Sequence, residues 1–74
     1  MTKLVTVGSI VIIRMDGQKY EYTLVYPEES DLTKGKISIE SPLGRILLGQ
    51  GEDSEVDLQI PEEGKLKCKI VKVR

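Results

Sequence analysis

The sequence predicts an α+β fold, in which a small, bent antiparallel β-sheet of four to five strands packs on one short helix. Runs with apolar residues at alternate positions, typical of half-buried strands, occur in both halves of the chain. Between them, residues 40–50 (ESPLGRILLGQ) place apolar residues at helical spacing. A helix this short is unstable alone, so it must pack on the sheet.

Residues 7–15 (VGSIVIIRM) and 19–26 (KYEYTLVY) are rich in β-branched and aromatic residues, and Asp16-Gly17 lies between them. This dipeptide indicates a tight type I′ hairpin. A two-residue loop pairs Ile13 with Tyr20, and opposed residues share a face. The core face of the hairpin is then apolar and consists of Val11, Ile13, Tyr20, Tyr22 and Leu24.

Residues 27–35 are polar and acidic and predict a surface loop, followed by a short strand at 36–39. Ser41 can cap the helix, and Pro42 suits its first position. Gly49 supplies a left-handed stop. We expect the helix to approach the sheet closely at Gly44 and to pack through Leu43, Ile46 and Leu47.

The last two strands, 55–60 and 65–70, alternate apolar with polar residues. Keeping the apolar residues on one face predicts the pairs 60/66, 58/68 and 56/70 and a loop over residues 61–65. Asp57 then lies opposite Lys69. The apolar phase changes after Ile70, which predicts either a bulge or a second buried surface at the edge.

Composition excludes several classes of function. The 74 residues carry eleven basic and twelve acidic side chains, a net charge of −1, which argues against a module that binds nucleic acid through its phosphates. The chain has no His and one cysteine, Cys68, so transition-metal and acyl-transfer sites lack their residues. No apolar run is long enough to span a membrane. We expect a single domain, residues 1–74, in the cytoplasm, without cofactor or metal.

Most of the other residues considered for catalysis, metal binding or recognition are better explained by a structural role. Cys68 alternates inward and is predicted to lie in the core. The acidic loop 28–31 lacks the spaced ligands of a calcium site. The tyrosines at alternate positions favour a sheet face over a stacking platform. The lysines have acidic neighbours and are expected to form a solvated strand face, consisting of Lys65, Lys67, Lys69 and Lys72.

Arg45 falls in the first helical turn, where the helix dipole disfavours a cation, so it is not expected to stabilise the helix. An interaction role and an ordinary surface role are equally favoured for it.

Residues 35–50 (GKISIESPLGRILLGQ) resemble the signature of the C-terminal domain of the bacterial Gre transcription elongation (transcript-cleavage) factors. The family pattern is Gly-Lys-Ile-Ser, then Ser-Pro-x-Gly-Arg-x-Leu-Leu-Gly. TLVYP (23–27) resembles the Rnk branch of that family. VGSIV and SEVDLQIPEEGKLKCKIVKV resemble the start and the final hairpin of the domain, so the likeness extends from Val7 to Val73.

The resemblance implies an FKBP-like fold that docks on RNA polymerase at the rim of its secondary channel. In the family, the edge around the Ser-Pro helix start contributes to that contact. Gre factors cleave transcripts through acidic residues at the tip of an N-terminal coiled coil, and this sequence begins where the globular domain begins. The resemblance therefore implies docking without catalysis, through the positions that correspond to Glu40, Ser41, Pro42, Leu43 and Arg45.

Two alternatives remain open at this point: a general protein-interaction domain of Rnk type, and an FKBP-like prolyl isomerase, which the absence of Phe and Trp disfavours. The sequence departs from the family pattern at Glu40, where Asp is usual, and at residues 52–55. It does not decide whether the domain dimerises through its lysine-rich strand, or whether binding activates or inhibits transcription.

Overall fold

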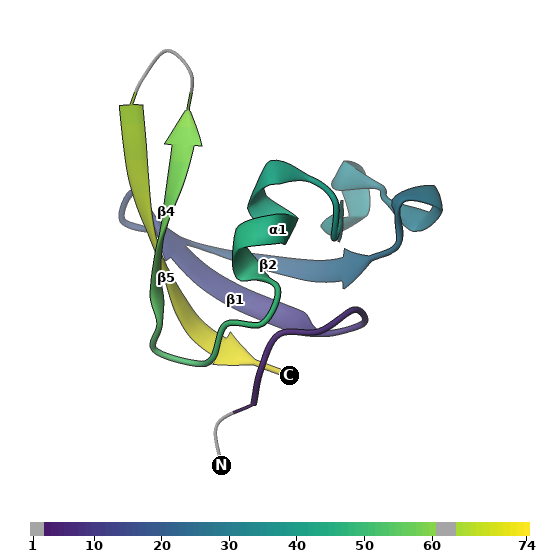
Figure 1. Ribbon diagram of the computed structural model, residues 1–74, viewed down its shortest axis with the longest axis horizontal. Helices are drawn as coiled ribbons and strands as arrows, with labels where there is room; N and C mark the ends of the chain where they lie inside the picture. Colours follow the sequence, from purple (N-terminus) through teal and green to yellow (C-terminus); the bar gives the residue numbers. More distant parts are fainter. Residues whose placement is uncertain (1–2, 61–63) are drawn as a thin grey trace.

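A five-stranded sheet with one short α-helix against it makes up the fold (Figure 1). The computed structural model describes residues 3–60 and 64–74. Across the sheet the strands follow the order β3-β2-β1-β5-β4. The α+β class and the predicted elements are confirmed. The elements are β1 (Ile10–Met15), β2 (Gln18–Val25), the 3₁₀ helices η1 (Pro27–Glu29) and η2 (Leu32–Lys34), β3 (Lys36–Ser38), α1 (Pro42–Leu47), β4 (Glu55–Ile60) and β5 (Gly64–Val73).

The β1/β2 hairpin has the predicted register, with Ile13 paired to Tyr20. Asp16 (φ 52°) and Gly17 (φ 77°) both have positive φ. Positive φ at both central residues defines a type I′ turn, whose twist matches that of the flanking strands. Local turn chemistry is therefore sufficient to set this register.

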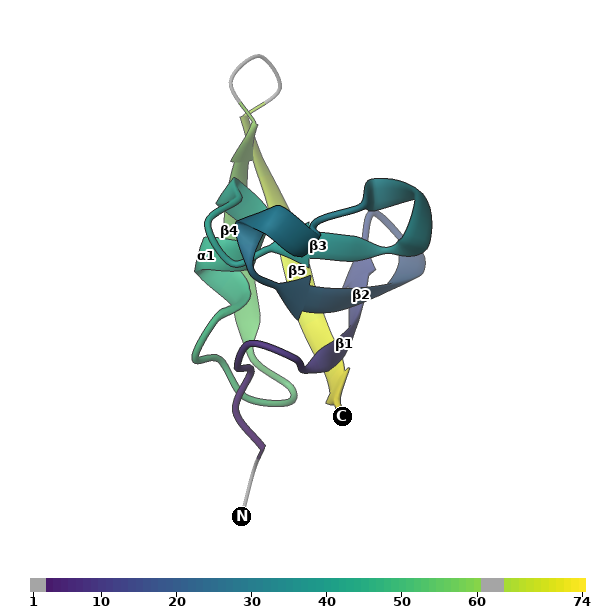
Figure 2. The ribbon, with the colours of Figure 1, turned by 90° about the vertical axis from the view of Figure 1, so that its right-hand side faces the viewer.

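β3 differs from the prediction of an entirely antiparallel sheet, because it pairs with β2 in parallel, Leu24 opposite Ile37. The sheet is therefore mixed. Residues 26–35 are the cause: they form η1 and η2, which carry the chain back along β2 before β3 begins (Figure 2). Strands that run in the same direction require a crossover connection of this kind.

The β4/β5 hairpin is shifted by two residues from the predicted register. Asp57 pairs with Lys67, whereas the sequence predicted Lys69. A shift of two residues leaves every side chain on its original face, so the apolar alternation cannot distinguish the two registers. The predicted faces are correct and the predicted pairs are wrong.

The predicted five-residue loop, 61–65, is also wrong, because Gly64 already pairs with Ile60. Gly64 has a φ of 93°, which side chains of the L configuration rarely adopt. A glycine at this position allows β5 to begin pairing with β4 at residue 64, two residues before the predicted first pair. Residues 61–63, which include Glu62, one of the acidic neighbours expected beside the lysines, lie outside the described residues.

β5 carries the predicted bulge after Ile70. Ile13 pairs with Ile70, but Ile12 pairs with Lys72, so Val71 is an extra residue on β5. An extra residue changes which side chains face the core. The buried residues of β5 are accordingly Cys68, Ile70 and Val73.

The lysine-rich strand does not lie at an edge of the sheet. β5 has β1 on one side and β4 on the other. The lysine-rich strand is thus an inner strand of the sheet, and the open edge strand on this side is β4.

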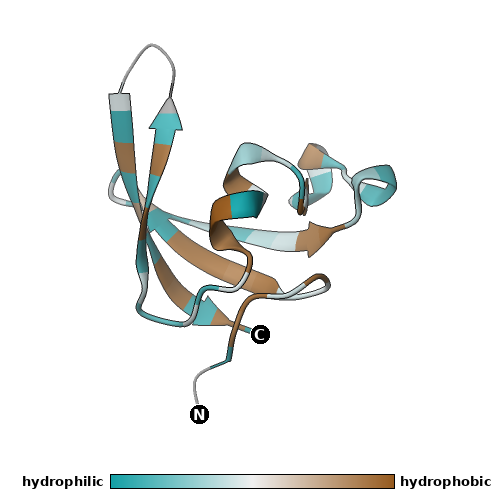
Figure 3. Ribbon diagram, in the orientation of Figure 1, coloured by the Kyte–Doolittle hydropathy of each residue, from teal (hydrophilic) through white to brown (hydrophobic). Residues whose placement is uncertain are grey.

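The core lies between α1 and one face of the sheet. Leu47 of α1 is fully buried, and Leu43 packs against the core cluster. Hydrophobic and hydrophilic residues alternate along β4 and β5 (Figure 3). Burying one large apolar side chain is worth about 1.5–3 kcal/mol, so this packing holds the six-residue helix in place. The core cluster consists of Val5, Val11, Ile13, Leu24, Ile37, Leu47, Ile70 and Val73. In residues 3–60 and 64–74, no helix has the length and apolar character needed to cross a membrane.

Candidate functional site

The start of α1 is held by the side chain of Ser41. Its Oγ accepts a hydrogen bond from the Gly44 amide at 3.0 Å, and its hydroxyl donates to the Ser38 carbonyl oxygen at 2.7 Å. Pro42 occupies the first helical turn, where a free amide is not needed. The predicted N-cap is confirmed, and the same hydroxyl also ties the helix to the end of β3.

Gly44 permits α1 to lie directly against the end of β3. The residue is buried, and a Cβ added to it would overlap the Ser38 carbonyl oxygen. A backbone oxygen cannot rotate away as a flexible side chain could. The predicted close approach is confirmed, and its partner is the last residue of β3.

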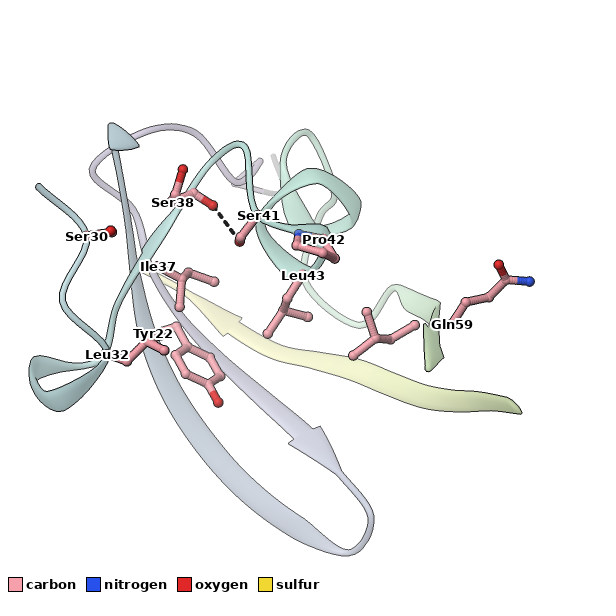
Figure 4. Close-up of a pocket in the computed structure, with 10 residues that line it drawn as sticks. Tyr22, Ser30, Leu32, Ile37, Ser38, Ser41, Pro42, Leu43 and Gln59 are labelled. Atoms are coloured by element: carbon pink, nitrogen blue, oxygen red, sulfur yellow. Dashed lines mark hydrogen bonds between the residues drawn. The ribbon is translucent and has the colours of Figure 1, made fainter. Parts of the chain in front are cut away.

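A groove of about 480 Å³ opens beside this helix start (Figure 4). Each of five elements contributes one large apolar or aromatic side chain to it. From β2, η2, β3, α1 and β4, respectively, these are Tyr22, Leu32, Ile37, Leu43 and Leu58. The groove is therefore a product of the whole fold, because no two of these side chains come from the same element.

Three of the five predicted site residues line the groove: Ser41, Pro42 and Leu43. Glu40 is exposed and directly precedes them, and its amide donates a hydrogen bond to Ser38 Oγ at 2.9 Å. Arg45 is exposed on α1 and is not part of the lining. Glu40 thus adjoins the groove in the chain, whereas Arg45 lies outside its lining.

Sequence reasoning missed Leu32, which forms the wall opposite α1. Its side chain is 79% exposed. The turn that presents it is capped by Asp31, whose Oδ1 accepts hydrogen bonds from Thr33 N at 3.1 Å and Thr33 Oγ1 at 2.6 Å. The signal that could have found it is a single leucine within an otherwise polar, acidic segment.

Tyr22 was predicted only as part of a sheet face. Its ring stacks on that of Tyr20, with centroids 6.2 Å apart and planes at 12°. Both rings pack against the core, whereas Tyr26 is 50% exposed. The stack orients Tyr22, so this wall of the groove is present before any partner binds.

The dipole argument for Arg45 does not hold. α1 has six residues, so Arg45 also lies in its last turn, where a cation is favoured. The position of Arg45 on the helix therefore gives no preference for an interaction role over an ordinary surface role.

Cys68 is a core residue, as predicted. It is fully buried, and burial, with a smaller contribution from the negative charge of Asp57, raises the pKa of its thiol. Because the thiolate is the reactive form, this thiol is inert at neutral pH. Among the described residues, no three His, Cys, Asp or Glu side chains are grouped so that they could hold a metal ion.

Comparison with known proteins gives the family. The model for the C-terminal domain of the transcription elongation factors GreA and GreB matches residues 1–74. The chain belongs to this family. The resemblance of the Ser-Pro-x-Gly-Arg segment to the Gre signature is thereby confirmed.

Full-length Gre factors share substantial identity with this domain. It is 43% identical over 58 residues to transcription elongation factor GreA of Nitratidesulfovibrio vulgaris, a match that covers 78% of this chain and 35% of that protein. It is 41% identical over 73 residues to GreA of Clostridioides difficile, covering 96% and 45%, respectively. The chain therefore spans less than half the length of these relatives.

Solved structures of Gre-family proteins have the same fold. GreA/GreB from Nitrosomonas europaea superimposes with a TM-score of 0.79 at 38% identity, over 95% of this chain and 59% of that one. Gfh1 from Thermus aquaticus gives a TM-score of 0.88 at 27% identity, over 99% and 49%. The curled sheet on one short helix is consistent with the FKBP-like fold that the Gre resemblance implies.

Proposed function

We propose that this Gre C-terminal domain binds RNA polymerase and is itself non-catalytic. The observation that carries the proposal is a preformed apolar groove beside the Ser-Pro helix start, in a chain that belongs to a family of transcription elongation factors. A domain docked at the rim of the secondary channel modulates elongation or competes there with full-length Gre factors.

The proposed contact surface contains an apolar centre with charged residues outside it. Pro42 and Leu43 line the groove, Glu40 precedes them and is exposed, and Arg45 is exposed elsewhere on α1. Buried apolar anchors with a polar rim are typical of protein interfaces. The role of Ser41 is structural, because its two hydrogen bonds fix the start of α1 and thereby position Pro42 and Leu43.

The chemistry of the groove supports a binding role rather than catalysis. Its polar lining within the described residues consists of serines, Gln59 and Tyr22, and the chain has no histidine to activate a hydroxyl. A prolyl isomerase requires an aromatic-lined pocket, and Tyr22 is the one aromatic residue among the described lining residues. The isomerase alternative therefore receives little support from the geometry.

The direct test is binding of the purified domain to core RNA polymerase at near-physiological salt. We expect saturable binding that full-length GreA displaces. Absence of saturable binding by the folded domain would overturn the proposal and favour the Rnk-type alternative, an interaction domain with a different partner.

The assigned surface is tested with a Glu40→Lys, Pro42→Ala double variant. We expect it to lower polymerase affinity, because it reverses a rim charge and removes part of the groove wall. Glu21→Lys is the charge-matched control, since Glu21 is exposed and alternates away from the groove side chain Tyr22. Equal affinities of the folded double variant and the control would refute the surface assignment.

A further inference from the structure

β4 has an open edge that is equipped to accept another strand. It is the terminal strand of the sheet next to β5. The Ile70 amide donates to the Ser54 carbonyl oxygen at 2.9 Å, and the antiparallel pattern continued from that bond turns the backbone polar groups of Val56 and Leu58 toward β5. The groups that point to the open edge are then those of Glu55, Asp57 and Gln59. No other described backbone segment hydrogen-bonds to this edge.

A second hollow, of about 390 Å³, follows this edge. Pro42 and Ile46 of α1 form one wall, and β4 contributes the other, together with Lys65 at the start of β5; the β4 residues are Asp57, Leu58 and Gln59. α1 lies alongside β4 in Figure 1. An open strand edge that faces a helix across a hollow is a geometry suited to binding an extended peptide as an additional strand.

We propose that the β4 edge binds an extended segment of another protein in which basic and apolar residues alternate. This interaction goes beyond the polymerase contact, because it uses the backbone of β4 rather than the groove between α1, β2 and η2. The two surfaces meet at Pro42, Leu58 and Gln59, which line both hollows.

The alternation of basic and apolar residues in the bound segment follows from the two faces of β4. Residues of an added strand that lie opposite Glu55 and Asp57 share the outer face with two exposed carboxylates. Lys69 and Lys67 of β5 lie opposite these carboxylates on their other side, one strand further from the added strand, so a Lys or Arg is favoured next to β4. Residues opposite Val56 and Leu58 share the face of α1 and meet Ile46, so an apolar residue is favoured there. Backbone hydrogen bonds give affinity, and the alternating side chains give specificity.

A second copy of this chain fits the edge less well. Pairing of β4 with its own copy would bring the Glu55 and Asp57 carboxylates of both copies to a single edge. Like charges on adjacent strands are destabilising. The charge of β4 therefore favours a basic segment of a different protein.

The proposal is tested with the heptapeptide KVKVKVK, acetylated and amidated at its ends, added to the ¹⁵N-labelled domain. We expect saturable amide shifts at Glu55, Asp57, Gln59 and Ile46. Asp57→Lys is expected to weaken binding about tenfold, because repulsion replaces attraction across the strands. Glu29→Lys, an equal charge change at an exposed residue of η1, is the matched control and is expected to leave binding unchanged.

Two N-methylated peptides separate strand addition from simple charge attraction without altering the domain. Methylating the lysine amides, which point to β4 in the proposed register, is expected to weaken binding about tenfold, because backbone hydrogen bonds are lost. Methylating the valine amides, which point to solvent, is expected to leave it largely unchanged. Equal affinities of the two peptides, shifts confined to other residues, or dimerisation of the free domain that the peptide does not reverse would each overturn the proposal. None of these results depends on polymerase binding.

Discussion

The Ser41 hydroxyl and the Ser38 carbonyl oxygen form a 2.7 Å hydrogen bond that joins the start of α1 to the end of β3. The same oxygen is the atom that excludes a side chain at Gly44. The position of the helix start, and with it one wall of the groove, is thus set by contacts to a single residue of an edge strand.

Ser41→Ala is expected to destabilise the domain by about 1–2 kcal/mol, because the N-cap is lost. Urea unfolding followed by circular dichroism measures the change. Ser30→Ala serves as the control, since Ser30 is exposed and the hydrogen bond it makes at the end of η1 uses its backbone amide. Equal losses in the two variants would contradict the capping role.

Gly44→Ala is expected to destabilise the domain by about 1–3 kcal/mol through overpacking against the Ser38 carbonyl oxygen. The sign of the stability change is informative, because a Gly→Ala substitution inside a freely exposed helix stabilises that helix by about 1 kcal/mol. The measurement is the free energy of unfolding in urea. A stabilised Gly44→Ala variant would show that the helix does not lie against β3 in solution.

Leu32→Ser is expected to leave the melting temperature nearly unchanged, because the side chain is 79% exposed. It is expected to weaken polymerase binding about tenfold or more if the groove is the contact, since an exposed apolar anchor is lost. Leu4→Ser, at a 58% exposed residue that does not line the groove, is the control. Unchanged affinity of the Leu32 variant would remove η2 from the proposed interface.

A double-mutant cycle tests the register of the β4/β5 hairpin. Asp57 and Lys67 are opposite one another, so the cycle between their alanine variants is expected to give a coupling of about 0.2–1 kcal/mol. The Asp57 and Lys69 cycle is the comparison and is expected to give less, because Lys69 lies opposite Glu55. A larger coupling to Lys69 would restore the register predicted from the sequence.

Stability is expected to fall at alkaline pH because of Cys68. Burial raises the pKa of its thiol above the ordinary value of 9.0, so the unfolded chain loses this proton at a lower pH than the folded one. The contribution to stability is complete below pH 9.0 and is lost as the pH rises through the folded-state pKa. The loss amounts to at most about 1.4 kcal/mol per pH unit.

Urea unfolding of the native protein and of Cys68→Ala across this pH range isolates the contribution of the thiol, because the two proteins differ only at this residue. The native protein is expected to show the steeper decline. Parallel declines would indicate that the thiol ionises equally in both states.

Local chemistry was sufficient for several elements of this fold. Asp16-Gly17 specified a type I′ turn, and that turn determined the register of β1 and β2. Ser41 and Pro42 marked the helix start. The change of apolar phase after Ile70 marked the bulge at Val71. In the turn and the helix cap the interacting groups are neighbours in the chain, and the bulge is visible in the alternation along β5 itself, so the sequence contains the information.

Predictions failed where two arrangements satisfied the same pattern. The β4/β5 hairpin can shift by two residues without moving a side chain to the other face, so the apolar pattern alone did not give the pairing of Ile60 with Gly64. The parallel pairing of β3 depended on how η1 and η2 carry the chain, which an acidic, polar composition does not encode. Leu32 was missed because an exposed leucine has no periodic pattern around it.

The sequence by itself determined the fold class, the helix with its cap, the apolar faces of both hairpins and, through its signature motif, the Gre family. These features follow from interactions between residues close in the chain or from alternation along one strand. Tertiary structure decided which strand lies at the edge, how β4 meets β5, and that Tyr22, Leu32, Ile37, Leu43 and Leu58 form one groove. A groove built from five elements depends on how those elements pack together, and no local pattern contains that packing.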